Sequence, residues 1–354
     1  MSYRVHVLYE HGADLNPYGS AYIRLLRPLS HPRIADKIRL SAGIAYDGQP
    51  VDAVIVDRLW RPDINFSAAE KLVAEVRSSG RKFIYALDDN FLDFPPDHID
   101  RPGKHKTEIV EFWLKEADAV WVTTPYLQER YRGYNNQIAV IPHALDERLL
   151  IRPGLDPDFH PETPGRLTIG YMGTFTHDDD LVMILPALEQ LCQRHEGVVL
   201  IELVGAISRN ETYERLRGLP VRVRRPRPEE SNYPLFLLWF TSQISWDIAV
   251  APLRDSPFSR GKSDIKFLDY SAIGAAGVFS RSPAYADSIQ SLENGILVED
   301  DPSAWFDALE RLILNRKLRR EIACNAAENL FAHRVLAVSA NRWLEAIESA
   351  ISAG

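Results

Sequence analysis

The sequence has few of the features expected of a secreted, membrane-spanning or zinc-binding protein. It contains only two cysteines, Cys192 and Cys324, in 354 residues. That is too few for a disulfide framework, and their spacing is not typical of zinc ligands. No run approaches the ~18 consecutive apolar residues of a membrane-spanning helix. The first residues lack the basic and apolar segments of a signal peptide. We therefore expect a protein of the reducing cytoplasm, with no bound metal.

Positive charge is also scarce. The chain has 41 Lys and Arg residues against 49 Asp and Glu residues, a formal net charge of −8. Such a chain repels polyanions as a whole, so we expect no nucleic-acid partner. The most basic run, residues 221–228, alternates Val and Arg. This pattern predicts an edge strand with one solvated face, and the alternative is peripheral contact with anionic lipid at the inner face of a membrane.

The composition is that of a globular protein, with 45% hydrophobic and 25% charged residues. Apolar runs of strand length alternate with amphipathic segments, which predicts an α/β fold with parallel sheets and crossover helices. A stretch rich in Pro and Gly interrupts the pattern, which then restarts. We predict two Rossmann-like domains, residues 1–145 and 167–334, joined by a linker over 146–166. The last helix, within 335–354, is a candidate to complete the first domain.

Ligands of open parallel sheets bind outside the carboxyl ends of the strands, and two hinged sheets would face each other across a cleft. In the first domain, Asp88 and Asp89 follow one predicted strand and Arg58 follows another. We predict that Asp88 is catalytic and that Asp89 and Arg58 bind an acceptor, together with Tyr18 and Gly19 in the first loop. The alternative for the two aspartates is an Asp-rich turn or helix cap.

In the second domain, a glycine turn containing Gly173 and Thr174 follows the first strand, and a cationic segment follows a later one. Cations are disfavoured at a helix N-terminus, yet three of them surround the predicted helix start near residue 264. A bound diphosphate would explain them, because the helix N-terminus and the cations would share its charge. The alternative is a solvated basic helix start. The predicted donor-binding residues are Gly173, Thr174, Lys262, Ser263, Asp264, Lys266 and Asp269, with Lys262 and Arg260 also predicted to be catalytic.

The segment 252–277 resembles the donor-binding segment of the family 4 glycosyltransferases. Residues 262–270, Lys-Ser-Asp-Ile-Lys-Phe-Leu-Asp-Tyr, resemble the Lys-Ser-x-x-Lys-x-x-Glu-Tyr pattern of a subset of that family. Asp269 then takes the place of the acid that binds the nucleotide ribose. The first acid of the family pair would fall at Gly261 and is missing. Residues 140–146 and 169–174 also resemble family segments.

The resemblance implies a GT-B fold and a retaining, metal-independent transfer from a nucleotide-diphosphate sugar to a glycan, lipid-linked or small-molecule acceptor, as in polysaccharide or glycoconjugate biosynthesis. The family's Arg and Lys after the first C-terminal turn are absent here, so we expect Lys262, with Arg260 or Lys266, to take their role. Because the first acid is missing, a non-catalytic nucleotide- or sugar-binding protein is the alternative. The sequence leaves open the sugar, the nucleobase, the acceptor and the oligomeric state.

Overall fold

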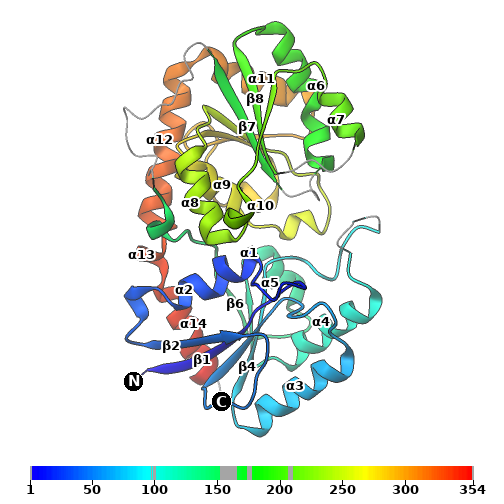
Figure 1. Cartoon of the computed structure of the whole chain (residues 1–354), viewed down its shortest axis with the longest axis vertical. Coiled ribbons are helices and arrows are strands. Elements are labelled where there is room, and N and C mark those ends of the chain that lie inside the picture. The colour runs from blue at the N-terminus through cyan, green and yellow to red at the C-terminus, as the bar shows by residue number, and fades with distance from the viewer. Residues whose placement is uncertain are drawn as a thin grey trace. The chain divides into compact units, whose positions relative to one another are not determined.

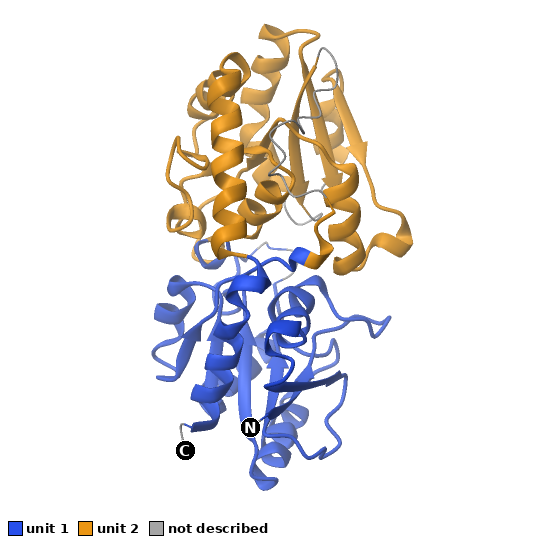
Figure 2. Ribbon diagram, turned by 90° about the vertical axis from the view of Figure 1, so that its left-hand side faces the viewer, with its two compact units in different colours: residues 1–147, 260–263, 335–354 blue, residues 148–259, 264–334 orange. Residues whose placement is uncertain are grey.

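The chain divides into two compact units. The computed structural model describes residues 2–96, 98, 101–151, 166–173, 178–205 and 210–352. Unit 1 comprises Met1–Glu147, Arg260–Ser263 and Val335–Gly354, and unit 2 comprises Arg148–Ser259 and Asp264–Arg334 (Figure 2). The returning C-terminal segment is thus grouped with unit 1. Most of the predicted linker, residues 152–165, lies outside the described residues, as does Thr174.

Unit 1 contains a six-stranded, fully parallel sheet in the order β2-β1-β3-β4-β5-β6. Strands β1, β2, β4 and β6 are labelled in Figure 1. In this order the chain changes direction across the sheet between β1 and β3, so a ligand site is expected where those two strands end. The strands are β1 (Tyr3–Leu8), β2 (Ile38–Gly43), β3 (Ala53–Asp57), β4 (Lys82–Leu87), β5 (Ala119–Val122) and β6 (Ile138–Val140). The helices are α1 (Gly19–Ala21), α2 (Arg27–Leu29), α3 (Phe66–Ser78), α4 (Lys104–Glu116), α5 (Pro125–Tyr131), α13 (Leu336–Ser339) and α14 (Asn341–Ser352).

Both faces of the unit 1 sheet are buried, because successive side chains of a strand point to opposite faces. In β3, Val54 and Val56 join one core cluster, with α3, α4 and α5. Ala53 and Ile55 join the other, which includes α2 and α14. Every residue of β3 is buried, as expected for a strand covered on both sides.

Unit 2 contains a second six-stranded parallel sheet, in the order β12-β11-β10-β7-β8-β9. This is the Rossmann order, with its switch point between β7 and β10. The strands are β7 (Leu167–Gly173), β8 (Val199–Gly205), β9 (Val221–Arg224), β10 (Ile248–Ala251), β11 (Ala276–Ser280) and β12 (Ile296–Val298). The helices are α6 (Asp178–Arg194), α7 (Asn210–Leu216), α8 (Tyr233–Gln243), α9 (Ile265–Ala272), α10 (Pro283–Ala286), α11 (Pro302–Leu314) and α12 (Arg316–His333).

The prediction of an α/β protein with parallel sheets is confirmed. The arginine-rich run forms β9 at a sheet edge, as predicted, and Arg222 pairs there with the buried Glu202 of β8. The sequence analysis did not predict β2, α7 or α8. The single last helix that it predicted is two helices, α13 and α14. None of the described helices is both long enough and apolar enough to cross a membrane.

One glycine of β7 is required by packing. A Cβ atom on Gly170 would lie 1.8 Å from the ring of Trp246, which is buried and donates a hydrogen bond to Glu202. We expect Gly170→Ala to lower the free energy of unfolding by about 3 kcal/mol, at the upper end of overpacking costs. Urea titration measures this. At Gly133 a Cβ would have nothing within 4 Å, so Gly133→Ala is the control. Equal stability of the two variants would contradict the prediction.

Candidate functional site

The carboxyl ends of β7 and β8 approach each other closely in unit 2. Gly205 has φ +76°, and a Cβ atom on it would lie 2.3 Å from the carbonyl oxygen of Gly173. Only glycine therefore fits at position 205. The loop after β10 is held by hydrogen bonds: the Arg254 amide donates to Asp180 Oδ1 over 2.9 Å, and the Ser259 hydroxyl donates to the Arg254 carbonyl over 2.6 Å. Close backbone packing and hydrogen bonds thus hold the segments around the switch point of this sheet.

Helix α9 follows this loop and carries two of the predicted donor-binding residues. Lys266 Nζ lies 4.8 Å from the centre of the Tyr171 ring of β7. Asp269 is buried, and among the described residues its Oδ1 atom has no hydrogen-bond partner. Burial raises the pKa of Asp269 to about 7, although Lys266 favours the ionised form. A buried carboxylate oxygen without a donor is costly unless a ligand supplies one.

Asp264 has structural partners. Its two carboxylate oxygens accept hydrogen bonds from Arg334 over 2.7 and 2.8 Å, and Ser288 donates to one of them over 2.5 Å. Asp264 is the N-cap residue of α9, but its side chain makes no capping hydrogen bond to the helix. The reason is that Arg334, at the end of α12, takes both carboxylate oxygens.

The short segment Arg260–Ser263 is grouped with unit 1, where it contacts the ends of β4 and β5. Lys262 Nζ lies 2.8 Å from Asp89 Oδ1. The Thr124 hydroxyl donates to the Gly261 carbonyl over 3.5 Å. A Cβ atom on Gly261 would lie 2.9 Å from Leu127 and 3.2 Å from Asn90. The position of the missing family acid is therefore tightly packed in this chain.

Arg58 and two aspartates meet at the strand ends of unit 1. Arg58 directly follows β3, with its Nε 3.6 Å from Asp88 Oδ1 and its Nη2 3.6 Å from Asp89 Oδ2. Burial favours the neutral form of Asp88, but Arg24 and Arg58 outweigh burial and lower its pKa. Asp88 therefore stays ionised at neutral pH. Two predicted acceptor residues and the predicted catalytic carboxylate thus lie together.

The other predicted residues lie around this cluster or along the same segment. Tyr18, 47% exposed, precedes Gly19 at the start of α1, and the Tyr18 amide donates to the Glu10 carbonyl over 3.0 Å. Arg260 is exposed in a 3-10 turn, and Ser263 is half-buried.

The sequence analysis missed two charged residues of this site. Arg24 binds Asp57 and lies 3.5 Å from Asp88. Glu10 lies 3.1 Å from Arg58. The position of Glu10 just after the first strand was a usable signal, whereas nothing in the pattern pointed to Arg24.

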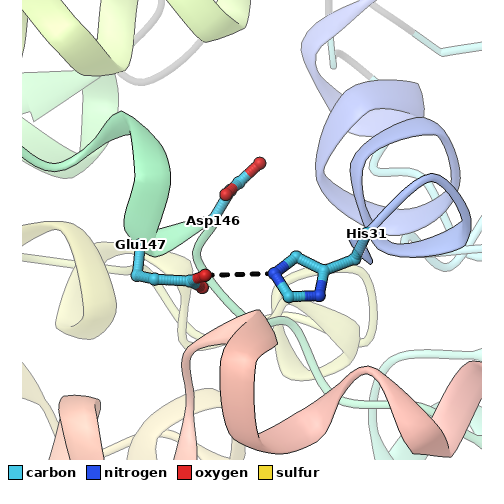
Figure 3. Close-up of side chains that lie close together, drawn as sticks. All are labelled: His31, Asp146 and Glu147. Atoms are coloured by element: carbon cyan, nitrogen blue, oxygen red, sulfur yellow. Dashed lines mark hydrogen bonds and ion pairs between the residues drawn. The ribbon is translucent and has the colours of Figure 1, made fainter. Parts of the chain in front are cut away.

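One group of side chains within the described part of the chain has ligand atoms close enough for a metal. His31, Asp146 and Glu147 place one such atom each within 4.8 Å of the others (Figure 3). His31 Nε2 lies 3.0 Å from Glu147 Oε1, while His31 Nδ1 accepts the Arg33 amide over 3.2 Å. Nε2 therefore carries the proton that a metal would have to replace. Arg27 also donates to Asp146. The residues satisfy one another and do not fit a metal site.

Residues 166–315 match the family model described as glycosyl transferases group 1. Among curated proteins, none matches this chain.

Similar solved structures extend over nearly the whole chain. HepE from Anabaena, in complex with UDP and glucose, has a TM-score of 0.69 at 13% identity, covering 98% of this chain and 100% of that one. Sucrose-phosphate synthase from Thermosynechococcus elongatus has a TM-score of 0.71 at 14% identity, covering 99% and 100%. The fold is GT-B. A glycosyltransferase from Rickettsia africae scores 0.66 at 13% identity, covering 99% of both chains. The predicted GT-B fold is thus confirmed, and at these identities the structures show the fold alone.

Proposed function

We propose that this protein is a glycosyltransferase that moves a sugar from a nucleotide-diphosphate sugar to a hydroxyl group of an acceptor. The observation that carries the proposal is the buried Asp269, one turn after Lys266, whose Oδ1 has no hydrogen-bond donor within the part of the chain that the structure describes. The two hydroxyl groups of a ribose would donate hydrogen bonds to the Asp269 carboxylate, and Lys266 would bind the diphosphate. The family match over residues 166–315 supports the same activity.

In the proposed reaction the acceptor oxygen forms a bond to the anomeric carbon as the bond from that carbon to the diphosphate oxygen breaks. The nucleoside diphosphate leaves with the bonding electrons, and the acceptor proton passes to one of its phosphate oxygens. Because the acceptor attacks on the face that the diphosphate leaves, the anomeric configuration is retained. Negative charge develops on the departing phosphate, so preorganised cations and amide N–H groups lower the barrier. No divalent metal is required in this proposal.

We assign binding of the nucleotide-sugar donor mainly to residues 260–269. Lys262, with Arg260 or Lys266, stabilises the departing diphosphate. Asp269 binds the ribose. Gly173, at the end of β7, and the Ser263 hydroxyl are assigned to the phosphates. Thr174, which lies outside the described residues, is assigned to them from its place in the sequence. Asp264 supports this segment through Arg334 and does not contact the donor in our proposal.

The acceptor side is assigned to the strand ends of unit 1. Asp88 is the proposed catalytic carboxylate, because Arg24 and Arg58 keep it ionised. Asp89 and Arg58 bind hydroxyl groups, and the exposed ring of Tyr18, beside Gly19, covers the acceptor sugar. Four carboxylates gather here, Glu10, Asp57, Asp88 and Asp89, which favours a glycan or the sugar of a lipid-linked acceptor as the substrate.

A non-catalytic binding protein is the second candidate, favoured by the packing at Gly261. A Cβ atom at this position would lie 2.9 Å from the Leu127 Cδ2 atom, so an acid in place of Gly261 would require Leu127 to shift. Turnover separates the two candidates. A catalyst releases nucleoside diphosphate from a nucleotide sugar, whereas a binder holds the donor unchanged.

Thermal stability with a panel of UDP, GDP, dTDP and ADP tests donor binding. At a concentration about 100 times its Kd, the matching nucleotide should stabilise the protein by about 2.7 kcal/mol, since it binds only the folded state. The matching nucleoside without phosphates is the control and should have a much smaller effect. If none of the four nucleotides raises the melting temperature, the assigned donor site is wrong.

A further inference from the structure

Glu10 lies at the switch point of the unit 1 sheet, two residues after β1. Its Oε2 lies 3.1 Å from Arg58 Nε, and its Oε1 accepts the Leu59 amide over 3.4 Å. Its own amide donates to Asp57 Oδ2 over 3.0 Å, and its carbonyl accepts the Tyr18 amide. Glu10 therefore links the ends of β1 and β3 to the loop that carries Tyr18.

Arg58 has a conformation that needs such support. Its φ is +48°, in the left-handed region that a long side chain rarely adopts. Strained residues of this kind persist where the surrounding structure holds them, and they cluster at functional sites. The guanidinium lies 5.0 Å from the centre of the Phe91 ring and faces Glu10, Asp88 and Asp89. Of these three carboxylates, Glu10 is the nearest to it.

We propose that Glu10 is a positioning residue of the acceptor site: its ionised carboxylate holds the Arg58 guanidinium, so that Asp88 and Asp89 keep the orientation that binds acceptor hydroxyls. The inference rests on the proposed transfer reaction and adds to it a residue and a pH dependence. Because Glu10 contacts the acceptor only through Arg58, its role is distinct from those of Asp88 and Asp89.

The same contact makes the site sensitive to pH. Burial raises the pKa of Glu10 to about 7, because Arg58 offsets only part of the desolvation, and Asp57 and Asp88 raise it further. Three charged groups therefore face Glu10: Asp57 at the end of β3, Arg58 directly after it, and Asp88 directly after β4. Arg24 pairs with both Asp57 and Asp88. Below about pH 7 the carboxyl gains a proton and its ion pair with Arg58 is lost.

The test compares wild type with Glu10→Gln and Glu10→Ala. Release of UDP is followed between about pH 6 and pH 8 at a saturating concentration of UDP-glucose, with methyl glucosides as acceptor probes. The bound ribose then keeps Asp269 ionised, so the titration of Asp269 does not contribute to the profile. Wild type should gain activity as the pH rises through about 7. Glu10→Gln should show at every pH the activity that wild type has at low pH, because glutamine mimics the protonated acid. Glu10→Ala should be roughly 10- to 100-fold less active throughout. Glu116→Gln, which removes an exposed pair with Arg77 on a distant helix, should behave like wild type.

Crystal structures of wild type and Glu10→Ala provide the second readout. In the variant the Arg58 guanidinium should have moved from its place beside residue 10 toward Asp88 and Asp89 and changed their orientation, with the rest of unit 1 unchanged. An unmoved Arg58, or a Glu10→Gln profile with the wild-type pH dependence, would overturn the positioning role. If the wild type releases no UDP, GDP, dTDP or ADP from the corresponding nucleotide sugars, the proposed function fails, and the position of Arg58 still decides the role of Glu10.

Discussion

Replacing Asp269 with asparagine should stabilise the unliganded protein at neutral pH and weaken its binding of a nucleoside diphosphate. The pKa of Asp269 is about 7 in the fold, against the ordinary value of 3.8 for an aspartate in water. An acid whose pKa is raised by folding loses stability as the pH rises through that range, here between about pH 4 and pH 7. The full cost above pH 7 is on the order of 4 kcal/mol. Asparagine has the same shape and no charge to bury.

Two measurements check this prediction. Thermal or urea unfolding from about pH 4 to pH 8 should show a stability difference that grows with pH and levels off above about 7. Affinity for UDP, or for whichever nucleotide the panel selects, should fall roughly 10- to 100-fold, since asparagine replaces one of the two acceptor oxygens of the carboxylate with an NH2 donor and carries no charge. Asp307→Asn, at an exposed position of α11, should change neither quantity. A destabilised Asp269→Asn with unchanged affinity would show that the carboxylate serves the fold.

The opposite signs of these two effects identify what Asp269 does. Replacing a residue that serves packing lowers the stability of the protein. Replacing a residue that serves a ligand raises the stability of the protein measured without that ligand. The same reasoning applies to Arg58, whose left-handed backbone is also unfavourable by itself. Both units thus contain unfavourable residues near the switch points of their sheets.

The fold was predictable from the sequence wherever burial alone decides the pattern. Strands such as β3 and β10 are buried throughout, so their sequences are continuous apolar runs. β2 was missed because its sequence, Ile38–Gly43, is mostly exposed at a sheet edge and contains Arg and Ser. α8 was missed because apolar residues surround its whole circumference, so no helical period is visible in its sequence, Tyr233–Gln243.

Part of the candidate site could also be predicted from the sequence. Residues at the ends of buried strands, such as Asp88 and Arg58, can be located because parallel strands end at a common edge. The partners of Lys262 and Asp264 could not be predicted. Lys262 pairs with Asp89, which is 173 positions away in the sequence, and Asp264 pairs with Arg334. Such pairs depend on which segments lie side by side in the fold, and no periodic pattern in the sequence indicates that.

Lys262→Ala should reduce turnover by roughly 100- to 1,000-fold, the usual effect of removing one group that stabilises charge in the transition state. It should also weaken UDP binding, because the diphosphate loses a cation. Asp89→Asn should have the opposite effect on UDP. Lys262 Nζ lies 2.8 Å from Asp89 Oδ1, so a diphosphate that binds this lysine has to compete with the carboxylate.

Measuring UDP affinity and the rate of UDP release from UDP-glucose for both variants separates these roles. Asp89→Asn should bind UDP several-fold more tightly than wild type and still turn over more slowly, since it has lost a hydrogen-bond acceptor for the second substrate. Lys317→Ala, which removes an exposed lysine that pairs with Glu321 on α12, controls for the change in net charge and should match wild type. Wild-type turnover by Lys262→Ala would remove the lysine from the mechanism, whereas unchanged UDP affinity in Asp89→Asn would show that Asp89 does not compete with the diphosphate.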